Sequence, residues 1–348
     1  MRNVAILLVI YCFLISLFAI NKPFLLKKGD TVAVIATANT MKKYNIERLK
    51  KGIKKLQEVG FKVKYRKDLF TREYGYLAGT DEERAKEFQE AFLDKNVKAV
   101  ITAAGGYGCM RFLNLVDWNK IKKHPKIFIG FSDNTALHLA INKKCGFPSV
   151  HGTGVIFLWG NAENRPYAFR HLLALITDFY KDKNVSFSNW GGDDFDRVKP
   201  LPVKVVNEGS KTAKGVLIGG NLSLVSSLIG TPYEPDWKGK ILFIEDVHED
   251  IYRIDRMLCQ LKLAGVFDKV NGVILGTFRK CEADKDEPCL TLWQVFDDYF
   301  KGRPYPVIAN FPTGHIEDNL PLPEGVKVEI SVDKPYLKIL EKPFIKEK

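Results

Sequence analysis

The sequence lacks the residue patterns of a metal protein. Its six cysteines include no CxxC pair, and its six histidines stand singly along the chain. Structural zinc sites need such paired ligands, so we expect no metal site, and we expect no other cofactor. The net charge of +12 comes without zinc-finger spacing or the aromatic signature of RNA-binding modules. Nucleic acid is therefore not an expected partner.

One long apolar run stands at the start of the chain, where residues 4–20 are apolar apart from Ser16. The run has the length of a signal-peptide core and is slightly short for a membrane span. We expect residues 1–20 to be a signal peptide cleaved near Ala19, with an uncleaved membrane anchor and a buried helix as alternatives. The first two place the body of the protein in the periplasm or cell envelope. An uncleaved leader would be its only contact with the membrane.

Two of the cysteines are close enough in sequence to form a local disulfide. Cys281 and Cys289 flank the charged loop 282–288. Such a pair can be oxidised in an exported protein, and a reduced pair on a charged loop is the alternative. Three others stand isolated among apolar neighbours and are expected in the core: Cys109, Cys145 and Cys259.

The first half of the chain alternates between strands and helices. Short apolar or alternating runs predict the strands, and amphipathic spacing predicts the helices between them. This alternation predicts a parallel sheet covered by helices on both faces. We expect the α/β domain to span residues 24–177. Its predicted strands are 31–36, 61–65, 97–102 and 126–130, and its predicted helices are 42–58, 81–94, 110–123 and the segment after Ser132.

The pattern breaks down over residues 178–214, which separate the first domain from a second one. Residues 184–196 are rich in Asn, Ser, Gly and Asp, and two prolines follow shortly after. This composition predicts an interdomain linker. A chain of 348 residues is long enough for two domains, and we expect the second to span residues 215–343. Its predicted strands are 215–218, 240–244, 272–275, 306–309, 326–330 and 336–340, with a helix over 251–264.

A serine lies between a buried strand and a helix. Ser132 follows the apolar run 127–130, and helical spacing begins at Thr135. A serine at such a turn has its hydroxyl clear of the sheet, and the first helical N–H groups point toward charge that develops beside it. This is the geometry of an acyl-transfer nucleophile. The alternative is that Ser132 only caps the helix.

A serine nucleophile also needs a base, an orienting acid and donors for the oxyanion. Glu245 and His315 each follow a buried strand, where a side chain projects from the carboxyl edge of the sheet. Taken singly, Glu245 and His315 each also fit a solvent-exposed residue that has no catalytic role. Gly105 and Gly106 form a turn that either presents backbone N–H groups to an anion or has no role beyond the turn itself. His151 opens the segment His-Gly-Thr-Gly and is a candidate for the substrate pocket.

Several motifs in a fixed order resemble those of one family. Residues 103–140 contain Ala-Ala-Gly-Gly-Tyr-Gly-Cys-Met-Arg and Gly-Phe-Ser-Asp-Asn-Thr-Ala-Leu-His. The C-terminal half adds Gly-Gly-Asn-Leu-Ser, Phe-Ile-Glu-Asp-Val-His-Glu, Tyr-Arg-Ile-Asp-Arg-Met-Leu and Phe-Pro-Thr-Gly-His. Over nearly all of residues 25–340 the chain resembles the LD-carboxypeptidases, the serine peptidases of family S66. The resemblance implies a flavodoxin-like, parallel-sheet N-terminal domain and a smaller, β-rich swivelling C-terminal domain, with the active site between them.

Carried over motif by motif, the resemblance implies that Ser132 is the nucleophile, His315 the general base and Glu245 the acid that orients it. It also implies that the backbone N–H groups of Gly106 and Asp133 form the oxyanion hole. A homodimer is the implied assembly. The candidate substrate-binding residues are Gly105, Tyr107, His151 and Asn221.

The resemblance implies hydrolysis of the L,D bond that releases terminal D-alanine from murein tetrapeptides through an acyl-enzyme. One alternative is a peptidase of the microcin C self-immunity type, which cleaves an acyl-nucleotide amide. Another is a non-catalytic cell-wall-binding protein on the same scaffold. The stretch from Glu245 to Glu249 and the following Tyr-Arg-Ile-Asp-Arg are more similar to the murein branch.

Overall fold

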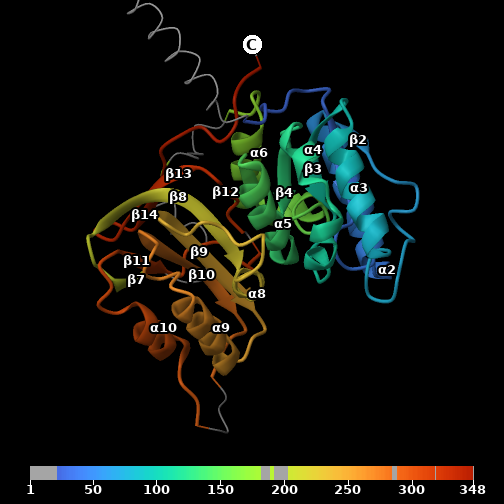
Figure 1. Ribbon diagram of the computed structural model, residues 1–348. Helices are drawn as coiled ribbons and strands as arrows, with labels where there is room; N and C mark the ends of the chain where they lie inside the picture. The colour runs from blue at the N-terminus through green and yellow to red at the C-terminus, as the bar shows by residue number, and fades with distance from the viewer. Residues whose placement is uncertain (1–21, 182–188, 192–202, 284–287, 318, 348) are drawn as a thin grey trace, which may run out of the picture.

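The computed structural model describes residues 22–181, 189–191, 203–283, 288–317 and 319–347. They form two sheets, one in the blue-to-green half of the chain and one in the yellow-to-red half (Figure 1). The expected leader, residues 1–20, lies outside the described residues. Within the described part of the chain, no helix combines the length and the hydropathy needed to cross a membrane.

The first sheet has the strand order β12-β5-β4-β3-β1-β2. Its first five strands in chain order run parallel, and β12 joins β5 in antiparallel orientation. The strands are β1 (Thr31–Ile35), β2 (Lys62–Lys64), β3 (Val97–Thr102), β4 (Ile127–Gly130), β5 (Ser149–His151) and β12 (Leu322–Glu324).

Helices cover both faces of this sheet because successive strand residues point to opposite sides. Val32 and Val34 pack in one cluster with residues of α2 and α6, whereas Ala33 and Ile35 pack in another with residues of α3, α4 and α5. The prediction of a parallel sheet covered on both faces is confirmed. These helices are α2 (Lys43–Val59), α3 (Asp81–Leu93), α4 (Trp118–Lys122), α5 (Thr135–Ala140) and α6 (Pro166–Ile176).

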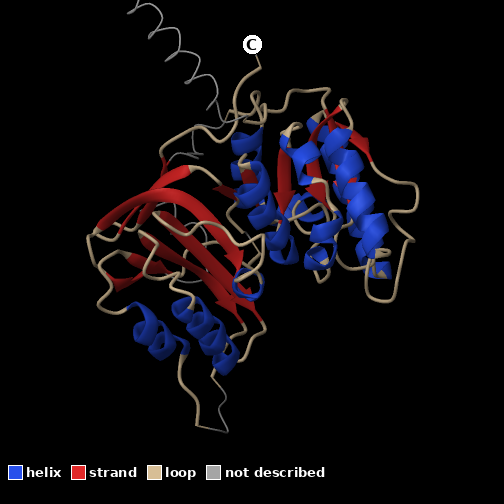
Figure 2. Ribbon diagram, viewed as in Figure 1, coloured by secondary structure: helices blue, strands red, loops and turns tan. Residues whose placement is uncertain are grey.

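The second sheet has the strand order β6-β14-β13-β8-β9-β10-β11-β7, with a parallel centre from β8 to β11 and antiparallel strands on both sides. Helices pack on one face of this sheet (Figure 2), where Leu242 and Ile244 share a core cluster with Ile254 and Leu258. The strands are β6 (Asn189–Gly191), β7 (Lys204–Asn207), β8 (Thr212–Asn221), β9 (Lys240–Val247), β10 (Gly272–Arg279), β11 (Val307–Ala309), β13 (Lys327–Ser331) and β14 (Tyr336–Ile339), and the helices are α8 (Leu222–Ser227), α9 (Ile251–Leu263) and α10 (Leu292–Phe300).

Two segments depart from the expected division of the chain. The segment 178–214, expected as a plain linker, supplies β6, β7 and the start of β8 to the second sheet. Conversely β12, from the expected second domain, completes the edge of the first sheet beside β5. Pairing removes the exposed edges that β5, β11 and β14 would otherwise present. Pro323 suits the outer strand β12, because a proline has no N–H to offer to a further strand.

The structure has Cys281 and Cys289 as free thiols. Cys281 is buried and Cys289 is exposed, on either side of residues 284–287, which lie outside the described residues. Burial raises the pKa of the Cys281 thiol to about 11, so this thiol stays protonated at neutral pH. The structure therefore corresponds to the reduced alternative.

Candidate active site

Ser132 lies on a sharp turn directly beyond the end of β4. Its φ is +61°, a left-handed conformation that costs a residue with a side chain about 1–2 kcal/mol. The glycines around it permit the turn: a Cβ on Gly130 would lie 2.7 Å from the Cβ of Asn134, and one on Gly105 would lie 3.0 Å from the Cβ of Ser132. The N-cap positions of the two helical segments that follow are Phe131 and Asn134. Ser132 is therefore not the helix cap that the alternative interpretation supposed.

Three side chains form a continuous hydrogen-bonded chain. The Ser132 Oγ and His315 Nε2 atoms are 3.1 Å apart, and the His315 Nδ1 and Glu245 Oε2 atoms are 2.7 Å apart. In the tautomer that fits both contacts, Nδ1–H donates to the carboxylate and the serine hydroxyl donates to Nε2. Ser132 follows a strand of the first sheet, whereas Glu245 lies in β9 and His315 follows β11 of the second. The hydrogen bonds among these three side chains therefore form only when the two sheets pack together.

The local backbone fixes the imidazole of His315. Gly314 precedes it at a φ of +128°, and a Cβ there would lie 3.2 Å from Glu245 Oε2. The N–H of Gly314 donates to Asn319 Oδ1 at 2.8 Å, which ties the turn to the segment that follows. On its other side, the ring of Phe131 packs against the imidazole with centroids 4.5 Å apart. Glycine suits position 314, because this φ is strained for a residue with a side chain and a Cβ would lie tightly against the carboxylate.

The surroundings of His315 favour its protonated form. Burial lowers its pKa, but the charge of Glu245 and the hydrogen bond to it outweigh burial, so the pKa of His315 lies above its ordinary value. Glu245 is fully buried, and its Oε1 atom has no hydrogen-bond partner among the described residues. Such an arrangement can accept the proton of a serine hydroxyl and stabilise the imidazolium that forms.

A glycine turn after β3 lies beside the nucleophile. The N–H of Tyr107 donates to Asn39 Oδ1 at 2.9 Å, and the N–H of Cys109 donates to the buried Asp133 Oδ2 at 2.8 Å. Gly106 has a φ of +128°, and a Cβ there would lie 2.3 Å from the Cγ of Asn39. These bonds hold the turn against the start of the segment that carries Ser132. The oxyanion-hole role of the Gly106 and Asp133 N–H groups stays a prediction.

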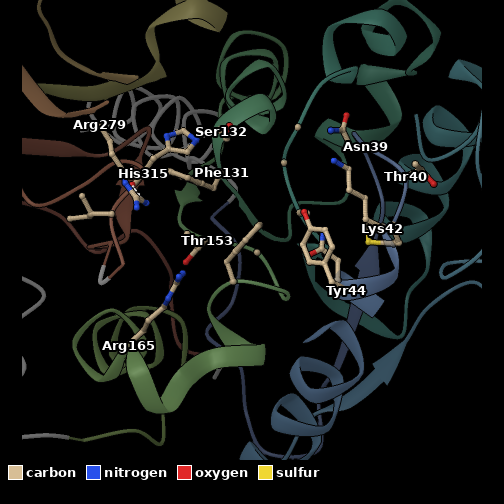
Figure 3. A pocket seen from close by; sticks show the side chains of 18 residues that line it. Asn39, Thr40, Lys42, Tyr44, Phe131, Ser132, Thr153, Arg165, Arg279 and His315 are labelled. Atoms are coloured by element: carbon tan, nitrogen blue, oxygen red, sulfur yellow. Dashed lines mark hydrogen bonds between the residues drawn. The ribbon is translucent and has the colours of Figure 1, made fainter. Parts of the chain in front are cut away.

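Ser132 opens into a cavity of about 390 Å³ whose described lining carries positive charge. Lys42, Arg165 and Arg279 line it, and no aspartate or glutamate is among the described lining residues. Figure 3 shows Arg279 beside His315 and Ser132, whereas Arg165 and Lys42 come from other walls of the cavity. A cavity with this charge is suited to an anionic ligand.

Among the polar residues that line the cavity, sequence reasoning missed Asn39, Lys42, Arg165 and Arg279. Asn39 follows β1 and Arg279 ends β10, so the rule that placed functional side chains at strand ends would have found both. Lys42 precedes α2, and Arg165 precedes the proline that begins α6. Neither of these two positions has a signal in the sequence that separates it from other basic residues.

The candidate substrate-binding residues are not all at the cavity. Gly105 lines it, and the exposed Tyr107 lies next to the lining glycine turn. His151 is fully buried, with its ring packed against Phe131 at 5.0 Å between centroids. Asn221 is buried as well, and its side-chain amide donates to Asp246 Oδ1 at 2.9 Å. The structure gives His151 and Asn221 supporting positions behind the cavity, because their strands turn these side chains into the core.

A buried cluster of possible metal ligands comprises His138, His151 and Glu324, with ligand atoms within 4.8 Å of one another. Both ring nitrogens of His138 already have partners, Ser149 Oγ at 2.7 Å and the carbonyl of Gly130 at 2.9 Å. Burial raises the pKa of Glu324 to about 8 and lowers the pKa of His151 well below its ordinary value. The low-polarity surroundings thus favour the neutral form of each group.

Comparison with known families agrees with the order of the motifs. Residues 32–152 match the profile of the LD-carboxypeptidase N-terminal domain, and residues 214–330 match that of the C-terminal domain. The chain belongs to the LD-carboxypeptidase family. The resemblance inferred from the sequence is confirmed, and with it a peptidase of family S66.

Similar proteins cover nearly the whole chain. A Bacillus subtilis protein named probable murein peptide carboxypeptidase is 37% identical over 317 residues, 91% of this chain and 93% of the relative. The microcin C7 self-immunity protein of Escherichia coli is 31% identical over 339 residues, 92% of this chain and 96% of the relative. Relatives named as carboxypeptidases support a peptidase activity for this chain.

Solved structures of relatives share the two-domain α/β architecture. A microcin C7 self-immunity protein in complex with glutamyl sulfamoyl guanosine has a TM-score of 0.79 and 26% identity, covering 92% of this chain and 99% of that chain. The muramoyltetrapeptide carboxypeptidase of Oxalobacter formigenes has a TM-score of 0.68 and 28% identity, covering 90% and 99%. The expected α/β fold class with two domains is thus confirmed.

Proposed function

We propose that this protein is a serine LD-carboxypeptidase that releases terminal D-alanine from murein tetrapeptides. The hydrogen-bonded chain from Ser132 through His315 to Glu245, at the wall of a cationic cavity, is the observation that carries the proposal. Family membership supports a carboxypeptidase. The names of two relatives, a murein peptide carboxypeptidase and a muramoyltetrapeptide carboxypeptidase, support the substrate class.

Acylation follows from the positions of these side chains. Ser132 Oγ attacks the carbonyl carbon of the residue before D-alanine, and its proton passes to His315 Nε2. The backbone N–H groups of Gly106 and Asp133 receive the negative oxygen of the tetrahedral intermediate. The carbon–nitrogen bond then breaks, and His315 gives the proton to the leaving amine. Glu245 stabilises the imidazolium between these two proton transfers.

Deacylation uses the same groups in reverse. A water molecule attacks the ester carbon while His315 Nε2 takes a proton from the water. The ester bond to Ser132 Oγ breaks, and the proton returns to that oxygen. The products are free D-alanine and a tripeptide with a new carboxylate.

The contact between the two halves of the chain supports this assignment of roles. The N–H of Asn221, at the end of β8, donates to Thr135 Oγ1 at the start of α5, at 3.0 Å. Asn221 also donates to Asp246, the residue after Glu245. These bonds connect the helix that follows the nucleophile to the strand that holds the acid. They fix the relative position of Ser132 and Glu245, which come from different sheets.

The second candidate function is a peptidase of the microcin C self-immunity type. Its support is the structural likeness to the self-immunity protein, with a TM-score of 0.79. Parallel assays on a murein tetrapeptide and on an acyl-sulfamoyl adenylate separate the two, with products identified by mass spectrometry. We expect D-alanine and tripeptide from the first substrate. Hydrolysis of the adenylate alone would favour the second candidate, and tetrapeptide binding without turnover by folded protein would favour a cell-wall-binding protein.

A further inference from the structure

We propose that Arg279 binds the terminal carboxylate of the departing residue and so selects peptides that end at that residue. This assignment rests on the proposed function and goes one step further, because it names the group that makes the enzyme a carboxypeptidase and not an endopeptidase. Lys42, Arg165 and Arg279 line the cavity, and the carboxylate of Glu245 is fully buried behind His315.

Arg279 is held against the catalytic histidine. It is the last residue of β10, and its Nη1 donates to the carbonyl oxygen of His315 at 3.1 Å. The guanidinium therefore lies within hydrogen-bonding distance of the backbone of His315. The bond through Nη1 leaves Nε and Nη2 available for a ligand. The edge formed by Nε and Nη2 has the geometry that binds a carboxylate through two parallel hydrogen bonds.

The chemistry of the leaving group places its carboxylate near Arg279. The leaving nitrogen must lie within reach of His315 Nε2, which protonates it. In a terminal amino acid, only one carbon separates that nitrogen from the carboxylate. The anion therefore lies a short distance from His315, where Figure 3 shows Arg279, whereas Lys42 and Arg165 reach into the cavity from other walls.

The test compares two substrates that differ only at this carboxylate. One is an L,D-tetrapeptide with a free terminal carboxylate, and the other is the same peptide with a terminal carboxamide. We expect the wild-type enzyme to prefer the free acid. In R279Q, kcat/KM for the acid should fall about 10- to 100-fold, mostly through KM, as when a hydrogen bond to a charged group is lost. Turnover of the carboxamide should fall much less, because this peptide lacks the charge that Arg279 binds, and R279K should restore part of the preference.

The carboxamide is also the internal control for folding and for the position of His315. If R279Q slowed both substrates equally, Arg279 would act only through the His315 carbonyl, and the assignment would be overturned. R165Q removes the same charge from another wall, and loss of the preference in that variant alone would also overturn it. A wild-type enzyme that released neither D-alanine from the acid nor D-alanine amide from the carboxamide would refute the proposed function itself. A wild-type preference that R279Q retained in full would refute only the role of Arg279.

Discussion

Replacing Glu245 by glutamine removes one charge and leaves the shape of the site unchanged. The carboxylate is fully buried, and its Oε2 lies 2.7 Å from His315 Nδ1. In the wild type this charge stabilises the imidazolium that forms when Ser132 attacks. Glutamine is neutral, and its amide N–H₂ can also donate to Nδ1 and favour the tautomer that cannot accept the serine proton.

The size of the effect follows from the distance between the two charges. At an effective dielectric constant of about 20, unit charges about 4 Å apart interact by about 4 kcal/mol. A loss of about 4 kcal/mol in transition-state stabilisation slows the reaction about a thousandfold. We therefore expect E245Q to release D-alanine from a murein tetrapeptide about a thousand times more slowly than the wild type, measured as kcat/KM.

The pH profile of the same variant gives an independent check. The pKa of His315 lies above its ordinary value of 6.5, and the base works only when unprotonated, so wild-type activity rises with pH through a midpoint above 6.5. Without the charge of Glu245, this pKa falls, and the acid limb of E245Q should move to lower pH. Thermal unfolding should show a folded variant. A folded E245Q with wild-type turnover and an unmoved acid limb would refute the reasoning.

Two further predictions concern the glycine turn and the buried core. G106A forces a Cβ into Asn39 at a φ of +128°, so kcat should fall at least about tenfold. G230A, at a φ of +79° in open space, should keep full activity. Equal kcat values for G106A and the wild type would exclude Gly106 from the site. Burial raises the pKa of Glu324 from 4.5 to about 8, so the stability of the wild type should fall as pH rises between these values. E324Q should lack this fall when thermal unfolding is measured across the same pH range. Parallel curves of stability against pH for the two proteins would contradict the prediction.

The strand ends and the motif order together predicted which side chains meet at the candidate site. Ser132 and His315 follow buried strands, Glu245 lies near the end of β9, and the three side chains are hydrogen-bonded as the motif order implied. The position of strand ends does not predict contacts between side chains of different sheets. The sequence therefore could not predict that His315 packs on Phe131. His151 was predicted as a pocket residue because it opens the segment His-Gly-Thr-Gly, but β5 turns this side chain into the core.

The differences between the predicted and the observed elements have identifiable physical causes. The helix expected over 110–123 is a 3₁₀ segment, Cys109–Leu115, followed by α4, because Asp117 accepts the N–H of Lys120 and begins a new helix. The short strand β12 contains a proline and only three residues, too few for a periodic signal. β7 lies beyond a polar stretch, and only its pairing with β11 makes it a strand. These elements depend on tertiary pairing, which no local pattern reports.

The central claim is that Ser132 is the nucleophile of a D-alanine-releasing carboxypeptidase. The direct measurement is the rate at which S132A and the wild type release D-alanine from a defined murein tetrapeptide, followed by mass spectrometry of both products. We expect the wild type to yield D-alanine and tripeptide, and a folded S132A to be slower by at least about a thousandfold. Near-normal release of D-alanine by S132A would contradict the account.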